Sequence, residues 1–200
     1  TLPRNDGFGA KDGVVGSWSL PRLINTGSRE ELIMSWPQQG RSYDPKTGQS
    51  LWHCDGLNPL VYSTTIFGEG VVVAMGGYSG STVAVRPGGS GDVTSTHRLW
   101  HELRDSGHIG SGIIKDGHIY IMNSNGIAQC VELQTGQSVW KERLKGSTAR
   151  SESWSSMVLS GDRLYVLNQN GDTFVLRASP KFDQLALYPL DDGLTNASHA

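Results

Sequence analysis

The sequence predicts an all-β protein, a β-propeller built of four-stranded antiparallel blades, with about four blades present. Three observations favour this fold: short apolar runs of strand length, an Asn-Gly turn that recurs between such runs, and phrases that repeat every 40 to 48 residues. No stretch of 12 residues or more has a clear helical periodicity. A two-layer sandwich also has short strands and turns, but it does not require phrases to recur at this period.

The clearest repeat is a hairpin that occurs twice with an offset of 45 residues. The two copies read "GHIYIMNSNGIAQCVEL" and "DRLYVLNQNGDTFVLRA". Each copy joins two apolar runs through the dipeptide Asn-Gly, at residues 125–126 and 170–171. Because Asn and Gly both tolerate positive φ, this dipeptide predicts a type I′ turn in each hairpin.

A second repeat ends each unit with a Thr-Gly corner and a large apolar residue. The phrase "TGQS" precedes Trp52 and, 88 residues later, Trp140. In the first copy, Pro45 suits the start of a type I turn and Gly48 suits the left-handed residue after it. The intervening copy replaces the corner with the longer loop "RPGGSGDVTST". This loop is a candidate ligand contact.

Tryptophan marks the strand that follows this corner or loop. Trp100 is the equivalent of Trp52 and Trp140 in the intervening copy, and the fourth copy, "FDQLALYPL", places Leu185 at the same position. Indole is large and rigid, so it covers much apolar area between two twisted sheets. We therefore expect these tryptophans to pack between adjacent blades, with ligand stacking as the alternative.

A third pattern, one large residue followed by one small residue, opens each unit. It occurs with spacings of 44, 47 and 45 at Trp18-Ser19, Tyr62-Ser63, Ile109-Gly110 and Trp154-Ser155. We expect these residues to mark the innermost strand of each blade. The single domain 1–200 then divides into blades at about 16–58, 59–103, 104–146 and 147–190, and 191–200 starts a further blade.

Composition narrows the range of functions. The formal net charge is −2 and no basic stripe is present, so nucleic-acid binding is not expected. No apolar run approaches the roughly 20 residues that a transmembrane helix needs. The start of the chain lacks the basic and apolar regions of a secretion signal. The two cysteines are too few for a disulfide scaffold and lack the spacing of a metal site.

No residue pattern specifies a reaction. His97 and His101 share one face of a predicted strand, but two ligands do not make a closed metal site. No Gly-x-Ser-x-Gly elbow and no ordered Ser/His/Asp set is present. Loops carry function more often than the scaffold, so the segment "KGSTARSESW" with Glu152 is a further candidate. The candidate ligand-binding residues on the rim or channel are Trp18, Tyr62, His108, Arg150 and Trp154, and packing between sheets is the alternative for the aromatic ones.

The pattern small-x-acidic-x-x-Thr-Gly-x-x-x-Trp resembles the PQQ-like, quinoprotein-type propeller repeat. It runs from Ser42 to Trp52 and from Cys130 to Trp140, with Ser and Cys in place of the usual Ala. Several phrases resemble PQQ-like proteins of planctomycete-type bacteria. The resemblance implies WD40-like architecture in rings of seven or eight blades, so this chain would be a partial ring. It also implies a periplasmic, cell-envelope or extracellular location.

The resemblance leaves three functions open. The first is a non-catalytic scaffold that binds a protein or another ligand through its loops and rim, with no cofactor. The second is a PQQ-dependent oxidoreductase, which would hold the quinone beside calcium and in many cases carries two adjacent cysteines; here Cys54 and Cys130 are 76 positions apart. The third is a sensory or scaffold segment of a larger signalling protein. We expect the first, with a protein partner.

Overall fold

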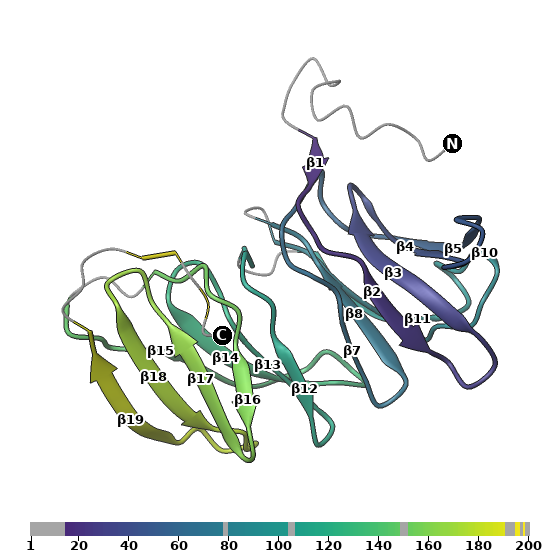
Figure 1. Cartoon of the computed structure of the whole chain (residues 1–200). Helices are drawn as coiled ribbons and strands as arrows, with labels where there is room; N and C mark the ends of the chain where they lie inside the picture. Colours follow the sequence, from purple (N-terminus) through teal and green to yellow (C-terminus); the bar gives the residue numbers. More distant parts are fainter. Residues whose placement is uncertain are drawn as a thin grey trace. The chain divides into compact units, whose positions relative to one another are not determined.

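The computed structural model describes residues 15–77, 80–103, 107–148, 152–190, 195–196 and 198. These residues form strands and turns without a helix, as the sequence predicts (Figure 1). The chain divides into two compact units, 1–105 and 106–200, which we describe separately. Each unit holds two sheets in which four strands follow one another in antiparallel pairs. Such sheets are the blades of a β-propeller, so the predicted fold class is confirmed.

The first unit contains blades 1 and 2. Blade 1 consists of β2 (Arg22–Asn25), β3 (Glu30–Trp36), β4 (Gln39–Tyr43) and β5 (Ser50–Asp55). Blade 2 consists of β7 (Ile66–Gly68), β8 (Val71–Met75), β9 (Thr82–Val85) and β11 (Arg98–Glu102). Two short parallel pairs complete the unit: β1 (Gly16–Ser17) with β6 (Leu60–Val61), and β10 (Gly91–Asp92) with β5.

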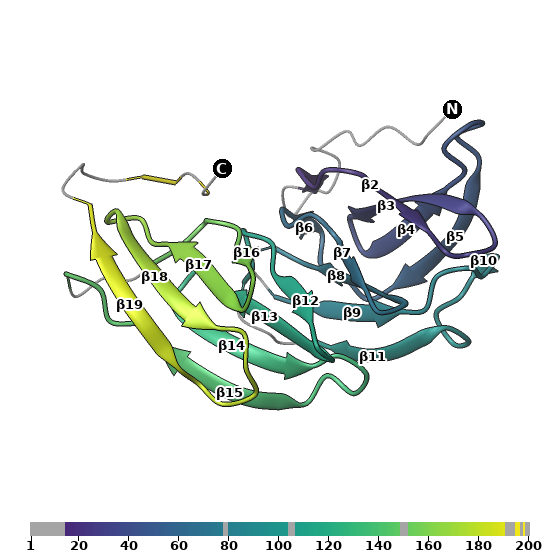
Figure 2. The same ribbon diagram turned by 60° about the horizontal axis from the view of Figure 1, so that its bottom comes forward.

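The second unit contains blades 3 and 4, which follow one another along the chain (Figure 2). Blade 3 consists of β12 (Ile113–Lys115), β13 (His118–Met122), β14 (Ile127–Glu132) and β15 (Ser138–Arg143). Blade 4 consists of β16 (Val158–Ser160), β17 (Arg163–Leu167), β18 (Asp172–Arg177) and β19 (Gln184–Pro189). The predicted further blade at 191–200 lies largely outside the described residues.

Strand register decides which side chains share a face of a blade. In blade 1, Trp52 pairs with Ser42, and Ser42 pairs with Ile33, so these three side chains point to one side. We call this side, and its equivalent in every blade, the indole face. The next register, with Leu32 paired to Tyr43, points to the other side, which we call the reverse face.

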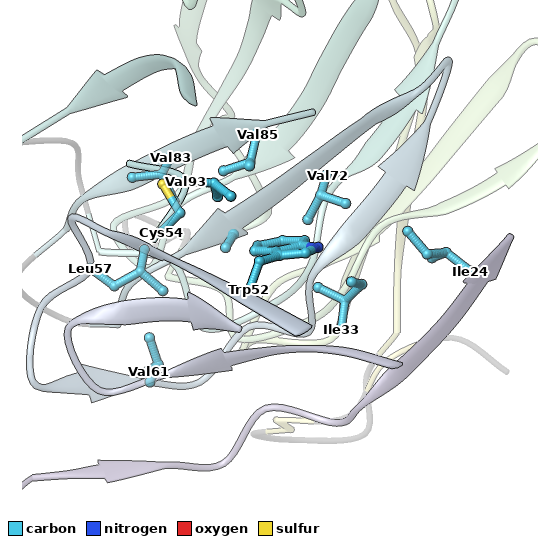
Figure 3. Close-up of a cluster of buried hydrophobic side chains, with 11 residues drawn as sticks. Ile24, Ile33, Trp52, Cys54, Leu57, Val61, Val72, Val83, Val85 and Val93 are labelled. Atoms are coloured by element: carbon cyan, nitrogen blue, oxygen red, sulfur yellow. The ribbon is translucent and has the colours of Figure 1, made fainter. Parts of the chain in front are cut away.

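The core of unit 1 is the indole face of blade 1 packed on the reverse face of blade 2. Trp52 is 1% exposed and lies in the middle of this cluster (Figure 3). The residues of blade 2 around it are small and aliphatic: Val72, Ala74, Val83 and Val85. The buried Glu31 carboxylate accepts hydrogen bonds from Trp52 Nε1 at 2.6 Å and from Ser42 Oγ at 2.9 Å. A large flat ring is thus fixed at both its apolar surface and its polar edge.

The core of unit 2 repeats this arrangement with different side chains. The indole face of blade 3 packs on the reverse face of blade 4, which presents Leu164, Val166, Phe174 and Leu176. Trp140 is only half-buried here. Its Nε1 donates to Ser179 O at 3.0 Å, and its ring meets Phe182 edge-on with 5.2 Å between centroids. The indole therefore lies at the margin of the core rather than at its centre.

The fourth tryptophan position is shifted by one residue from the sequence prediction. Trp100 pairs with Ala84, as Trp140 pairs with Cys130. In blade 4 the equivalent residue Val175 pairs with Ala186, whereas Leu185 falls on a register shift and pairs with nothing. Ala186, and not Leu185, therefore stands at the tryptophan position of blade 4.

The Thr-Gly corners follow the prediction and the Asn-Gly turns do not. Gly48 has φ +70° and donates to Asp44 O at 2.8 Å, which is the predicted left-handed residue. Asn125 does not have the positive φ that a type I′ turn requires. The reason is Asn123, whose Oδ1 accepts hydrogen bonds from Asn125 N and Ile127 N and fixes a different turn. Asn168 does the same for the second hairpin.

The long loop of blade 2 covers the outer strand of blade 1. Val93 within it is 1% exposed, and its N–H donates to His53 O at 2.9 Å. Thr94 Oγ1 accepts from Asp55 N at 3.0 Å. The loop therefore protects a sheet edge that would otherwise offer unpaired backbone groups, while residues at its ends and in its middle remain exposed.

Candidate functional site

The candidate site is the segment that leads into the first strand of each blade. The large residues of the third sequence pattern each lie four positions before such a strand, which begins at Arg22, Ile66, Ile113 or Val158. The sequence interpretation placed these residues on the innermost strand itself. The structure places them in the preceding loop, where a side chain has no sheet neighbour and can reach the surface.

In unit 1, two of these loops meet. The rings of Trp18 and Tyr62 stack with 4.8 Å between centroids and 7° between planes. The pairing of β1 with β6 brings them together, and Trp18 N donates to Val61 O at 2.9 Å. Gly77 lies beneath the Tyr62 ring, which a Cβ at that position would overlap. The backbone thus approaches closely enough to support a flat aromatic pair.

Exposed apolar side chains follow Trp18 closely along the chain. Trp18 is 54% exposed, Leu20 is 68% exposed and Leu23 is 55% exposed. Leu20 N donates to Thr64 Oγ1 at 3.4 Å, which links the two loops a second time. Single exposed apolar residues are ordinary, so it is the occurrence of three within six residues that makes this segment a candidate.

Serine hydroxyls fix the backbone on either side of Trp18 and Trp154 by hydrogen bonds. Ser17 Oγ donates to Ser35 O at 2.7 Å and accepts from Ser19 N at 3.3 Å. In unit 2, Ser153 Oγ donates to Leu167 O at 2.6 Å and accepts from Ser155 N at 3.2 Å. The sequence interpretation missed these two anchoring serines, although the repeated triplet Ser-Trp-Ser was a signal that could have found them.

In unit 2, the same position is less exposed. Trp154 is 38% exposed and Ile109 is half-buried. His108, predicted as a rim residue, is 1% exposed and therefore does not present its ring at the surface. Arg150 lies outside the described residues. Of the five predicted ligand-binding residues, Trp18 and Tyr62 are brought together, and Trp154 occupies the equivalent loop of the other unit.

A buried carboxylate holds the start of the Trp154 loop. Asp172 is fully buried, and its Oδ2 accepts hydrogen bonds from Ser147 N and Asn168 Nδ2, each at 2.9 Å. Burial raises the pKa of Asp172, but the hydrogen bonds from Ser147 and Asn168 outweigh this effect, so the pKa lies below its ordinary value. Gly146 is required beside it, because a Cβ there would overlap the carboxylate.

Histidine, cysteine and acidic side chains are the remaining residues that could bind a metal ion or react. The described residues contain no group of three or more His, Cys, Asp or Glu side chains that could hold a metal ion. Burial raises the pKa of both Cys54 and Cys130 to about 11, so both thiols are protonated at neutral pH. His97 and His101 bond separately, to Thr96 Oγ1 at 2.8 Å and to Gly56 O at 2.8 Å.

Comparison with known proteins agrees with the geometry. The model of the family described as "Outer membrane protein assembly factor BamB", a PQQ-like repeat family, matches residues 38–180. None of the curated proteins matches the chain. The part of the chain that the structure describes has no helix long and apolar enough to cross a membrane.

Three solved structures share the fold at low sequence identity. BamB from Moraxella catarrhalis has a TM-score of 0.64 and 12% identity, over 92% of this chain and 55% of that one. The quinohemoprotein alcohol dehydrogenase ADHIIG from Pseudomonas putida HK5 has 0.65 and 12%, over 88% and 34%. The C-terminal WD40 domain of Sif2 has 0.64 and 11%, over 84% and 48%. This chain thus spans about half or less of each, and the likeness concerns the fold alone.

Proposed function

The chain belongs to the PQQ-like repeat family whose description names BamB. We propose that it is a non-catalytic propeller segment that binds a protein partner. The binding surface lies on unit 1, on the loops before the first strands of blades 1 and 2, with Trp18 and Tyr62 as anchors. One observation carries the proposal: Trp18 stacks on Tyr62, whose ring lies against the backbone at Gly77, while the indole remains 54% exposed.

A rigid exposed indole suits protein recognition. Tryptophan and tyrosine dominate the residues that carry binding energy at protein interfaces, because they bury a large area and lose little conformational freedom. The serine anchors and the underlying Gly77 already fix the loop, so binding would cost less ordering. Leu20 and Leu23 extend the surface beyond the rings, as the apolar centre of an interface requires.

The location that we propose is the cell envelope. The support is family membership, since the family is described by an outer membrane protein assembly factor. Fractionation of source cells, followed by detection of the native protein with an antibody, tests this location. Recovery in the cytosolic fraction alone would overturn it.

Site-specific photo-cross-linking tests the binding surface. A photoreactive phenylalanine derivative replaces Leu20, which lies two positions after Trp18, or Leu103, which is 70% exposed directly after β11 and serves as the matched control. In an envelope extract we expect a discrete protein adduct from position 20 and none from position 103. The substitution Trp18→Ala should reduce the adduct at least about fivefold, since an anchor of this kind contributes over 1 kcal/mol.

Two results would overturn the proposal. One is the absence of any adduct specific to position 20. The other is saturable binding of pyrroloquinoline quinone and calcium with dye-linked alcohol oxidation, which would make the chain an oxidoreductase instead.

A further inference from the structure

The Asn-Gly dipeptides at the hairpin tips of blades 3 and 4 play no part in the proposed binding surface. The sequence predicted type I′ turns for both, and neither asparagine has the positive φ that such a turn requires. This dipeptide also has a reactivity of its own. Glycine has no side chain to hinder attack by its backbone nitrogen on the side-chain amide of the residue before it. Both copies are therefore candidate sites of spontaneous modification.

The backbone around the two dipeptides is nearly the same. Asn123 Oδ1 accepts hydrogen bonds from two backbone N–H groups of the first turn, at 3.0 and 3.1 Å. Asn168 Oδ1 does the same in the second turn, at 3.0 and 2.8 Å. Gly126 N donates to Asn123 O at 3.1 Å, and Gly171 N donates to Asn168 O at 3.2 Å. The restraint that this turn places on the glycine nitrogen is therefore common to both copies.

The side chains of the two asparagines differ. Asn170 is half-buried, and its Nδ2 donates to Thr148 Oγ1 at 2.8 Å. Asn125 is exposed, and its side chain makes no hydrogen bond within the part of the chain that the structure describes. The amide of Asn125 is thus free to rotate toward the Gly126 nitrogen, whereas the amide of Asn170 must first leave Thr148.

We propose that Asn125 is a site of spontaneous deamidation and that Asn170, in the same dipeptide, is protected. The Gly126 nitrogen loses its proton and attacks Asn125 Cγ, which closes a succinimide ring. The bond from Cγ to Nδ2 breaks, and Nδ2 takes up a proton and leaves as ammonia. Water then adds to either carbonyl carbon of the ring and opens it, which gives aspartate or isoaspartate at position 125. This inference is independent of the proposed function, because it concerns unit 2 and not the loops of unit 1.

Either product changes the tip of blade 3. The new carboxylate has a cation nearby, since Arg143 Nη1 donates to Asn125 O at 2.7 Å. Isoaspartate also adds one methylene to the backbone before Gly126. Gly126 O accepts a hydrogen bond from Leu144 N at 3.1 Å, and Leu144 is 1% exposed in the core of unit 2. The modification therefore reaches a backbone contact next to the core.

Ageing the purified chain tests the proposal. The folded chain is kept at about pH 8 and sampled over weeks, and peptides from a digest at mildly acidic pH are quantified by mass spectrometry. We expect deamidation at Asn125 to be at least about fivefold faster than at Asn170, the factor that one hydrogen bond supplies. The rate at Asn125 should rise with pH, because the attacking nitrogen must lose its proton.

Two controls separate the fold from the local sequence. In guanidinium chloride the two asparagines should react at equal rates, because the hydrogen bond of Asn170 to Thr148 is lost on unfolding. In the folded variant Thr148→Val, the rate at Asn170 should rise at least about threefold while the rate at Asn125 stays the same. Circular dichroism confirms that the variant retains its strands.

Three results would overturn the proposal. One is a wild-type chain in which Asn125 stays intact or reacts no faster than Asn170. Another is a rate difference that persists in guanidinium chloride, which would assign it to the neighbouring residues and not to the fold. The third is an Asn170 that stays equally slow in Thr148→Val, which would remove the hydrogen bond as the source of its protection.

Discussion

Among the described residues, each unit completely buries one carboxylate, and the two carboxylates hydrogen-bond to different kinds of group. In unit 1, Glu31 binds the indole of Trp52 and is reached from outside by Arg29, whose Nε donates at 2.8 Å. In unit 2, Asp172 binds the backbone of Ser147 and so holds a loop. The same repeat therefore uses its buried charge to fix a core side chain in one place and a surface segment in the other.

The difference follows the size of the facing side chains. Small residues at Val72 and Ala74 let Trp52 enter the core of unit 1, where its N–H needs a buried acceptor. In unit 2, Phe174 and Leu176 occupy more of the interface, and Trp140 lies at the margin with a backbone acceptor. A tryptophan shared by the repeat thus has a burial set by the neighbouring blade.

The largest expected effect contrasts the two tryptophans. Trp52→Ala should lower the free energy of unfolding by about 3–5 kcal/mol, because it opens a cavity in a core that cannot close around it. Trp140→Ala should cost about 1–3 kcal/mol, because only part of that side chain leaves water on folding. Urea denaturation followed by far-UV circular dichroism measures both. Equal losses would show that the burial difference has no energetic weight.

A charge test separates the second carboxylate from ordinary surface acids. Asp172→Asn should cost about 1–3 kcal/mol at pH 7, since it weakens two buried charge-assisted hydrogen bonds. The folded pKa of Asp172 is lowered, so its contribution is present above the unfolded value near 3.9 and is lost as pH falls through the folded value. The gap between wild type and variant should therefore shrink below about pH 4. A gap independent of pH would contradict this.

The Glu31–Trp52 hydrogen bond can be isolated by a double-mutant cycle. Trp52→Phe removes the N–H and keeps a ring, and Glu31→Gln removes the charge. We expect a coupling energy of about 1–2 kcal/mol, because the bond is buried and its acceptor is charged. Trp140→Phe combined with Glu31→Gln is the control pair and should be additive. Additivity in the first pair would mean that Glu31 serves Arg29 and Ser42 alone.

Repetition in the sequence was sufficient to predict the blades, because the apolar runs and the turn of each hairpin lie next to one another along the chain. The sequence did not predict the strand register where a bulge interrupts the pairing of two strands. The bulge in β18 to β19 shifts the tryptophan position from Leu185 to Ala186, and counting along the chain cannot detect a residue that pairs with nothing. The prediction of a type I′ turn at Asn125 failed for another reason. It considered the turn dipeptide alone and not the side chain of Asn123, which accepts a hydrogen bond from Asn125 N.

The candidate site was predicted as residues but not as an arrangement. The stack of Trp18 on Tyr62 depends on a parallel pairing between segments 44 residues apart, which no local pattern encodes. Histidine is a polar residue, so His108 was expected at the surface. It is buried instead, because the loop around it packs inward. Local propensity predicts strands well, whereas loops take their conformation from tertiary contacts.

The smallest expected effect concerns the feature that the two units share most closely. Gly48 and Gly136 have φ of +70° and +74°, and each donates to the acidic residue that opens its corner, at 2.8 and 2.9 Å. Because the left-handed conformation strains any residue with a Cβ, Gly48→Ala and Gly136→Ala should each cost about 1–2 kcal/mol. Nothing lies within 4 Å of a Cβ built at Gly48, so the cost there is conformational and not steric. Urea denaturation should give two losses within about 0.5 kcal/mol of each other, since the two corners have nearly the same φ and the same backbone hydrogen bond. A clearly larger loss at either corner would mean that the difference between the units extends from their cores to their turns.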